Sequence, residues 1–322
     1  GDRRPHHAVH PRRNREASMI EFLEAAIRIA TPLLLAALGG ILSERAGVFA
    51  VGLEGMMLMG AFGGAIGAWA TGSAVAGVAL AILCGAAIGL VVAIVTVAYR
   101  ADNMVTGLTA NILAAGLTSY FMRVLSGGGR PIAIHLTPLA PWPIPGLADI
   151  PVVGPLLFAL PPLTYLAIVG CVALAFFLTM TQAGLTLRAT GESPETVLAS
   201  GGEPFGVRMA SVVACGAIAG IGGAVLSLQQ VGTFTDGMTG GRGYLALASL
   251  IVARWNPFGA AIACLAFGAA EAFELRMQTF GLPVSSYIVQ MAPYLIALVV
   301  LAALGRASRM PAAIGQPLPR DQ

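Results

Sequence analysis

The chain has 322 residues, of which 57% are hydrophobic and only 10% are charged, and its formal net charge is +3. A soluble globular protein carries about 25% charged residues, so this chain has too few charges to cover a surface in water. A lipid bilayer accepts apolar side chains on the outside of a protein, and the composition therefore predicts an integral membrane protein. The basic residues are all arginines and are dispersed, which excludes a nucleic-acid-binding stripe.

The chain divides into three parts by composition. Residues 1–18 are polar and basic and lack the apolar run of a signal peptide, so we expect a disordered or non-native N-terminal extension there. Residues 19–305 are predominantly apolar and form one predicted transmembrane domain. Residues 306–322 are a polar tail.

Apolar segments in the transmembrane domain predict the membrane crossings, because about 20 apolar residues span the hydrocarbon core as a helix. The predicted spans are 21–42, 47–71, 75–98, 104–125, 162–180, 209–230, 244–255, 257–275 and 286–305. The segment 244–255 is short, which is typical of a broken or re-entrant helix. The predicted fold is an all-α, polytopic transmembrane bundle of about nine spans, within a range of about eight to ten, with some broken or re-entrant helices.

The distribution of arginine predicts the orientation of the chain. Arginines follow the last predicted span closely, and cytoplasmic segments carry the excess of basic residues, so the C-terminus is expected in the cytoplasm. Counting back over nine crossings places 181–208, Arg45, Arg100 and Arg254 inside and the N-terminus outside. The basic segment 1–18 fits this topology only if it is not a native part of the protein.

Polar residues inside two predicted spans are candidates for a solute pathway. A carboxylate such as Glu54 is costly in hydrocarbon and faces a cavity or a partner, and Asn111 presents an amide in an apolar helix. We take Glu54, Met57, Thr106 and Asn111 as candidate pathway residues. The alternative is structural: Glu54 would bond the backbone at a kink, and Asn111 would bond a neighbouring helix, which is the commoner role of an intramembrane amide.

Two further pairs of polar residues are expected near the membrane boundary. Gln229 and Gln230 end a predicted span, where an interfacial position is the simplest interpretation. Glu271 and Glu274 are three residues apart on one helical face and could couple protons. Their place near the end of a span favours solvated boundary charges instead.

The longest polar segment inside the chain is 181–208. Ser193 followed by Pro194 is typical of a helix start, and the glycines at 201–202 are typical of a helix end, so a short helix is predicted between them. Gly191 is expected to occupy a turn. A short helix of this kind can dock into a groove of a partner protein, and a plain connecting loop is the alternative.

Motifs of catalysis are missing from the sequence. It contains no Walker A sequence, no nucleophile elbow and no HExxH, so the chain is not expected to be an enzyme, and any ATP hydrolysis must reside in a partner subunit. The four cysteines lie in apolar stretches without CxxC spacing. We expect neither a bound metal nor a cofactor.

Four stretches carry a resemblance to a known family, and they occur in the family's order between 31 and 275. They read PLLLAALGGILSERAGVFAVGLEGMMLMGAF, NMVTGLTANILAAGLTS, GLTLRATGESPETVLASGG and GTFTDGMTGGRGYLALASLIVARWNPFGAAIACLAFGAAEA. Together they resemble the permease subunits of the branched-chain amino-acid/ribose/nucleoside ABC importer group. Within this group the chain most resembles the nucleoside-type "simple sugar" permeases. One departure is Ala50, which stands where the family's pattern has Asn.

The resemblance implies a function and a set of partners. The chain would form half of a translocation pathway for a nucleoside or related purine or simple-sugar solute in the bacterial inner membrane, surrounded by membrane lipid. Its partners would be an ABC ATP-binding subunit, a second identical or homologous permease subunit, and an extracytoplasmic solute-binding lipoprotein. The segment 181–208 would be the cytoplasmic coupling loop. The residues that match the coupling pattern are Gly184, Leu185, Arg188, Ala189, Gly191, Glu192 and Pro194.

Other classes of function remain as alternatives. A secondary transporter that works alone on an ion gradient would need intramembrane ion ligands or a proton relay, for which Glu54 and Glu271 are sparse. An ABC permease for branched-chain amino acids is a second alternative. An intramembrane enzyme is disfavoured, because the sequence offers no nucleophile or metal constellation.

Overall fold

The computed structural model of the chain describes residues 11–125, 139–143, 145–146, 154–279, 291, 295 and 310–318. Within these residues the secondary structure is entirely helical. The elements are α1 (Pro11–Arg45), α2 (Leu53–Thr71), α3 (Ala74–Ala93), η1 (Ile94–Ala98), α4 (Asn103–Leu125), η2 (Gly154–Phe158), α5 (Pro162–Met180), α6 (Gln182–Glu192), α7 (Pro194–Ala199), α8 (Pro204–Ala224), η3 (Val225–Val231), α9 (Arg242–Val252) and α10 (Pro257–Thr279), where η marks a π-helical turn.

Six helical stretches in the described part of the chain are long and apolar enough to cross a membrane. They are Met19–Arg45, Ala74–Ala98, Asn103–Leu125, Pro162–Met180, Pro204–Val231 and Pro257–Met277. Each coincides with a predicted span, so the all-α, polytopic fold is confirmed. The count of nine stays a prediction.

The other three predicted spans have different outcomes. The segment 47–71 contains α2, which has 19 residues and begins only at Leu53. The segment 244–255 corresponds to α9, an 11-residue helix too short to cross a bilayer, in agreement with the predicted broken element. The segment 286–305 lies outside the described residues.

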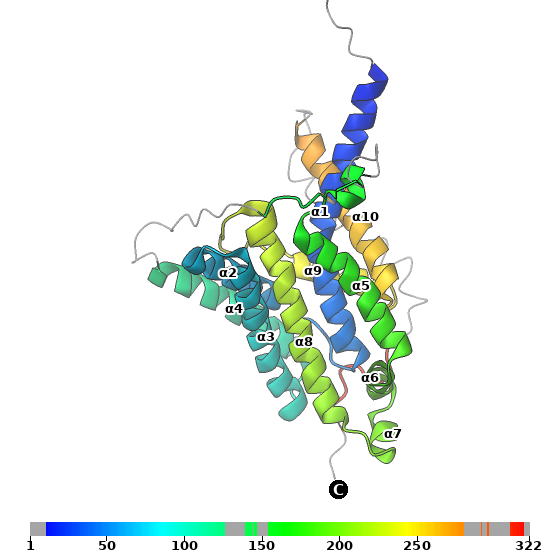
Figure 1. Cartoon of the computed structure of the whole chain (residues 1–322). Helices are drawn as coiled ribbons and strands as arrows, with labels where there is room; N and C mark the ends of the chain where they lie inside the picture. The colour runs from blue at the N-terminus through cyan, green and yellow to red at the C-terminus, as the bar shows by residue number, and fades with distance from the viewer. Residues whose placement is uncertain are drawn as a thin grey trace, which may run out of the picture.

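Two long helices, α1 and α8, form the centre of the bundle and pack against each other (Figure 1). On one side α8 packs against α2 and α3, and α4 lies outside α2. On the other side α1 packs against α5, α9 and α10. The short helices α6 and α7 lie together at one end of the bundle, which we call the α6–α7 end (Figure 1).

Glycines bring α2, α3 and α8 into close contact. A Cβ atom added to Gly85 of α3 would lie 2.2 Å from the carbonyl oxygen of Gly216 in α8. A Cβ atom added to Gly60 of α2 would lie 2.3 Å from the Cα atom of Gly220. Helices in lipid gain little from the hydrophobic effect and associate through close packing, so these small residues hold the three helices together.

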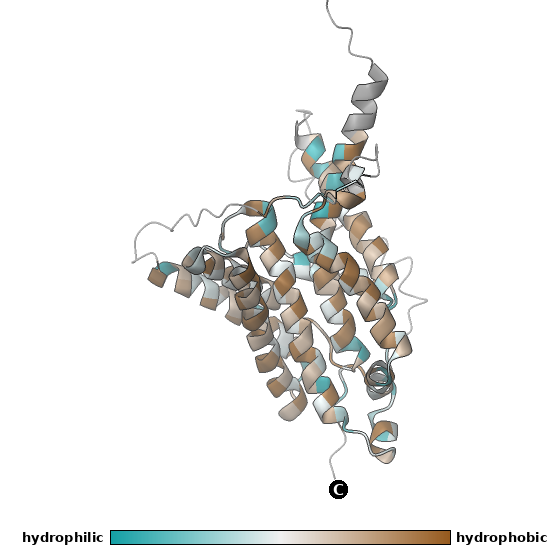
Figure 2. Ribbon diagram, viewed as in Figure 1, coloured by the Kyte–Doolittle hydropathy of each residue, from teal (hydrophilic) through white to brown (hydrophobic). Residues whose placement is uncertain are grey.

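The outer surface of the bundle is apolar, as a lipid environment requires. Figure 2 shows that most of the helical surface is hydrophobic and that hydrophilic residues gather mainly toward the ends. Large apolar side chains point outward from several helices, including Val75, Ile112 and Ile262, which are between 72% and 80% exposed. Such side chains are stable only against lipid or another apolar subunit.

Candidate functional site

Polar side chains meet where the first turns of α2 and α9 pack beside the middle of α4. We call this group the polar junction and define it by Glu54, Asn111, Thr239 and Tyr244. One Glu54 carboxylate oxygen accepts hydrogen bonds from the Thr239 hydroxyl (2.6 Å) and the Gly241 amide (2.9 Å). The other accepts one from the Gly243 amide (2.7 Å).

These bonds make Glu54 a cap for a helix that lies far away in the sequence. The helix α9 begins at Arg242, and its N-cap residue, Gly241, has no side chain that could accept from the first amides. The carboxylate of Glu54 supplies that acceptor, and its negative charge suits the positive end of the helix dipole. Glu54 therefore fixes the start of α9 against the start of α2.

Asn111 completes the polar junction from α4. Its side-chain oxygen accepts a hydrogen bond from the Gly55 amide (2.8 Å). Its side-chain nitrogen donates to the Val51 carbonyl (3.1 Å) and to the Tyr244 hydroxyl (3.0 Å). One amide thus joins α2, α4 and α9, which is the structural alternative to a role in the solute pathway.

The four candidate pathway residues are only partly brought together. Glu54 lies in the first turn of α2 and bonds the start of α9, whereas Asn111 bonds both the start of α2 and Tyr244 of α9. Met57 is fully buried in the apolar core, and the Thr106 hydroxyl donates to the Asp102 carbonyl of its own helix turn (2.7 Å). Asn111 makes the bonds to neighbouring helices that the structural alternative predicts. Glu54 does bond backbone amides, but they belong to the start of the distant helix α9. A role of the four residues in solute passage stays a prediction.

A further carboxylate, which the sequence alone did not indicate, is buried near the end of α1. Glu44 is fully buried and accepts hydrogen bonds from the Trp255 indole (2.6 Å) and from the amide of Ala50 (3.3 Å). Next to it, Arg45 donates to the carbonyls of Arg254 and Trp255 (3.4 Å each). These contacts tie the end of α1 to the connection between α9 and α10. Glu44 and Trp255 both lie in the stretches that carry the family resemblance, which is the signal that could have indicated them.

Ala50, the departure from the family's pattern, is buried in the same region. Its side chain is 4% exposed and belongs to the main apolar core, and its amide is the one that donates to Glu44. A methyl group at this position offers no hydrogen bond to a solute.

The polar segment 181–208 contains two complete helices, of which one was predicted, and the first residues of α8. The helix α7 begins as expected, with Ser193 as N-cap accepting from the Thr196 amide (3.4 Å). It ends at Ala199, and Gly201, just after the C-cap residue Ser200, has a φ of +80°, the left-handed conformation typical of the residue that follows a helix. The helix α6 was not predicted; it starts at the cap residue Thr181, whose hydroxyl accepts from the Gly184 amide (3.0 Å).

The expectation that Gly191 occupies a turn is wrong. Gly191 lies in α6, one residue before the end of the helix, and has no positive φ. Its small size serves packing instead, because a Cβ atom there would lie 2.1 Å from the carbonyl oxygen of Arg45. Gly191 is thus the point where α6 touches the end of α1.

The other residues that match the coupling pattern differ in exposure. Leu185 and Glu192 are exposed, Gly184 and Pro194 are buried, and Arg188 and Ala189 are intermediate. Leu185 on α6 and Leu198 on α7 are large apolar side chains that are 53% and 40% exposed at the α6–α7 end. The segment therefore presents apolar surface beyond the bundle, as a docking element requires.

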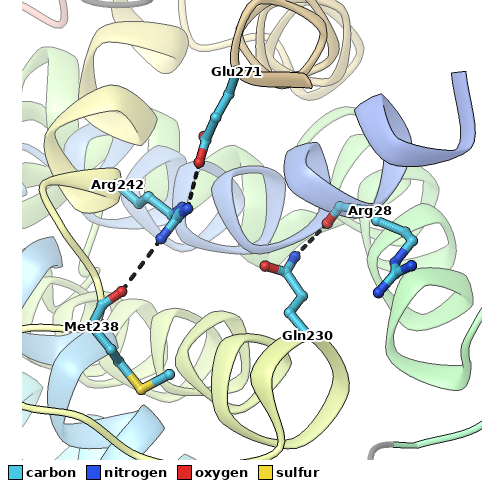
Figure 3. Close-up of polar contacts among 5 residues, drawn as sticks. All are labelled: Arg28, Gln230, Met238, Arg242 and Glu271. Carbon is cyan, nitrogen blue, oxygen red and sulfur yellow. Dashed lines mark hydrogen bonds and ion pairs between the residues drawn. The ribbon is translucent and has the colours of Figure 1, made fainter. Parts of the chain in front are cut away.

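The expectations for the boundary residues are wrong for Gln229, Glu271 and Glu274, whereas Gln230 is only half-buried. Gln229 is 3% exposed and donates to the hydroxyl of Thr164 inside the bundle (3.1 Å), so it is not interfacial. Glu271 forms an ion pair with Arg242 at the start of α9 (Figure 3). Glu274 is only 9% exposed. The tertiary structure explains the difference, because the loop before α9 brings Arg242 close to Glu271. Glu271 is therefore paired with a positive charge and is not simply solvated.

An apolar groove of about 540 Å³ opens between α5 and α8. Its lining comprises Leu42, Gly170, Ala173, Leu174, Phe177, Ala183, Leu187, Val207, Ala210, Ser211, Ala214 and Ile218. None of the polar junction residues lines it, and its surface suits an apolar chain better than a hydroxyl-rich solute. Over the described ranges, no three His, Cys, Asp or Glu side chains are grouped so that they could hold a metal ion.

Comparisons with known proteins cover almost the whole chain. Residues 22–305 match the family described as branched-chain amino acid transport system/permease component. A nucleoside ABC transporter permease protein from Lactococcus lactis is 35% identical over 86% of this chain and 90% of its own length. A guanosine ABC transporter permease protein from Bacillus subtilis is 34% identical over 91% of this chain and 94% of its own. A putative glucose ABC transporter permease protein from Haloferax volcanii is 36% identical over 81% and 78%, respectively. No solved structure matches the chain.

Proposed function

The chain belongs to the family of permease components of branched-chain amino acid transport systems, and from that premise we propose that it is the membrane subunit of an ATP-driven importer for a nucleoside or a related simple sugar. The observation that carries this proposal is the similarity, over 86% to 91% of the chain, to permeases named for nucleoside and guanosine transport. The similarity to a permease named for glucose supports a sugar or the ribose part of a nucleoside as the common element of recognition.

An ABC permease does not act alone. We infer that the chain works with an ATP-binding subunit, a second permease subunit of the same or a similar kind, and an extracytoplasmic solute-binding lipoprotein. It would lie in the bacterial inner membrane with its C-terminus in the cytoplasm and its N-terminus outside. In support, Arg45, Arg254 and the residues 311–316 all lie at the α6–α7 end of the bundle, and cytoplasmic ends of membrane proteins are rich in arginine.

The helices α6 and α7 are the proposed docking unit for the ATP-binding subunit. Their exposed leucines, Leu185 and Leu198, supply apolar contact area, and the exposed Glu192 and Glu195 can set the orientation of the partner at a polar rim. Because Gly191 touches the end of α1, a tilt of α6 on ATP binding or release would push on α1. The bundle would then shift between two packed states, one open to each side of the membrane.

The polar junction is the proposed part of the solute pathway. The helices α2 and α9 both begin inside the bundle, and interrupted helices line the binding sites of many transporters. Tyr244 is 42% exposed, and its hydroxyl is held by Asn111, so this hydroxyl is placed to meet a polar solute. Nucleosides and sugars, with several hydroxyl groups, suit such a site.

The test is transport by the reconstituted complex. The chain, its partner permease and the ATP-binding subunit would be placed in proteoliposomes with the binding protein, and uptake of radiolabelled guanosine, adenosine, glucose and leucine would be measured with and without ATP. We expect ATP-dependent uptake of a nucleoside or a sugar. ATP-dependent uptake of leucine alone would instead identify a branched-chain amino-acid permease, and uptake by the isolated chain on an ion gradient would identify a secondary transporter.

A further inference from the structure

A short C-terminal segment crosses the α6–α7 end of the bundle and binds three separate elements. We call this segment, 311–316, the C-terminal strap. The amide of Ala313 donates to the Gly191 carbonyl at the end of α6 (2.9 Å). The amide of Gly315 donates to the Gly47 carbonyl just after α1 (3.0 Å). The amide of Ala312 donates to the Glu192 carboxylate (3.3 Å).

Arg208, at the start of α8, holds the other side of the strap. It is 3% exposed, although it lies in the first turns of a helix near the end of the bundle. Its guanidinium donates to the carbonyls of Gln316 (2.7 Å) and Ala313 (3.2 Å) in the strap. Its third bond goes to the carbonyl of Ala46, just beyond the end of α1 (3.1 Å).

The chemistry of this contact explains why a charged group is buried there. The carbonyls at the end of a helix carry partial negative charge and lack partners in the helix itself, so a cation stabilises them. A planar guanidinium can serve several carbonyls at fixed angles, which a lysine ammonium cannot do equally well. Gly47 leaves the room for it, because a Cβ atom at that residue would lie 2.7 Å from the guanidinium.

We propose that Arg208 and the C-terminal strap form a relay that transmits the movement of α6 and α7 to α1 and α8. The proposal rests on the proposed function, in which α6 and α7 dock the ATP-binding subunit. The strap is the segment that bonds the end of α6, the end of α1 and, through Arg208, the start of α8 at the same time. Arg208 is therefore a positioning residue for transport, which acts on the pathway through the helices that it joins.

A relay and a merely structural contact predict different results when the contact is broken. A structural contact, once broken, lowers the amount of folded complex. A broken relay leaves the complex assembled and still able to hydrolyse ATP, but it lowers the amount of solute moved for each ATP hydrolysed. The relevant quantity is thus the ratio of solute uptake to ATP hydrolysis in the reconstituted complex.

The experiment compares four variants of the full chain in that complex. Arg208→Met removes all three side-chain donors and keeps much of the side chain's length. Arg208→Lys keeps the charge. Ala313→Pro removes the amide that binds Gly191 and leaves Arg208 intact. Arg123→Met is the matched control, since Arg123 is exposed at the end of α4.

The expected result is uncoupling. Uptake per ATP should fall about tenfold in Arg208→Met and in Ala313→Pro, because bonds to a charged group and to a helix end are lost, while the ATP-binding subunit still co-purifies. Arg208→Lys should recover part of the ratio, and Arg123→Met should match the wild type.

The relay is overturned by either of two results. A normal ratio of uptake to hydrolysis in an assembled Arg208→Met or Ala313→Pro complex would show that the strap transmits nothing. Failure of both variants to assemble would show that the contact is structural. A wild-type complex without any ATP-driven uptake would instead refute the proposed function, which keeps the two failures apart.

Discussion

Two carboxylates, the buried Glu44 and the half-buried Glu54, each bond groups that lie about 185 or more residues further along the chain. A carboxylate in a water-poor interior is stable only when its oxygens accept hydrogen bonds, and both residues meet that condition. Each carboxylate also joins an end of one helix to an element near α9. We therefore expect these two carboxylates to affect transport by holding helices in position. A substitution of either one should first of all lower the stability of the protein.

Glu54→Gln tests the polar junction. The amide keeps one acceptor oxygen, but its nitrogen is a donor and would face the amide of either Gly241 or Gly243. We expect the variant to lose about 1–3 kcal/mol of stability, because a backbone donor at the start of α9 loses its partner. Thermal unfolding in detergent measures this loss, with Glu203→Gln as the control, since Glu203 is exposed and its side chain makes no capping bond. Equal midpoints for the two variants would contradict the capping role.

Trp255→Phe tests the second carboxylate. Phenylalanine fills most of the same space but cannot donate to Glu44, which is then left with the longer bond from the Ala50 amide. A loss of about 1–3 kcal/mol is expected, again from an unsatisfied buried group. Trp69→Phe is a matched control, because Trp69 is 49% exposed. The prediction fails if both tryptophan variants unfold at the same temperature.

At the scale of helices, α6 and α7 form the proposed docking unit for the ATP-binding subunit, and the contact of α6 with α1 depends on Gly191. Alanine in place of glycine normally favours a helix by about 1 kcal/mol. At Gly191 the added methyl group would collide with the carbonyl of Arg45, and the backbone carbonyl cannot move aside without α1. Packing and helix propensity therefore predict opposite effects of the same substitution.

Gly191→Ala decides between the two effects. We expect it to lower ATP-driven uptake more than about tenfold and to weaken co-purification of the ATP-binding subunit, because α6 is pushed away from α1. Gly206→Ala is the control, since the added methyl group at that residue would meet its nearest neighbour at an ordinary distance of 3.6 Å. If Gly191→Ala transports as well as Gly206→Ala, the contact between α6 and α1 is not needed for coupling.

The packing of α3 on α8 allows a second test at this scale. Gly220→Leu would place a side chain where the carbonyl of Ala81 lies 2.4 Å from a Cβ atom. Helices in lipid that cannot approach closely lose most of their mutual attraction, so we expect the variant to insert but to be degraded or aggregated. Gly116→Leu should accumulate normally, because no atom lies within 4 Å of a Cβ atom there. Quantitative immunoblots of membranes compare the two, and equal levels would refute the packing argument.

For the whole molecule, the arrangement of the helices predicts which ends share a side of the membrane. The helix α1 runs the length of the bundle, so Glu21 lies near one end, and the α6–α7 end, with Glu195, is the other (Figure 1). The arginines Arg45 and Arg254 lie at the second end. The positive-inside rule then predicts that this end faces the cytoplasm.

Single-cysteine labelling tests this orientation. In a background without the four natural cysteines, Glu195→Cys should react with a membrane-impermeant maleimide only in inverted vesicles. Glu21→Cys should react only in intact, outward-facing cells or right-side-out vesicles. Labelling of both residues from the same side would overturn the topology, and labelling with the sides exchanged would reverse the orientation.

The sequence by itself determined the class of fold and the position of six spanning helices. A run of about 20 apolar residues in lipid has no stable alternative to a helix, since only a helix or a closed barrel satisfies its own backbone. The start of α7 was predictable for a similar reason: Ser193 and Pro194 act on the next few residues of the chain and need no distant partner. The shortness of α9 was also predictable from the length of its apolar run.

The tertiary structure decided what the polar residues do. The partners of Glu54, Asn111, Glu271 and Arg208 lie between 29 and 189 residues away, so no local pattern indicates them. Gly191 looked like a turn residue because a glycine in a polar segment usually is one, whereas the approach of α1 from elsewhere in the chain requires it inside a helix. Periodicity reports which residues prefer lipid or water, but it carries no information on which two distant polar groups will face each other once the helices pack.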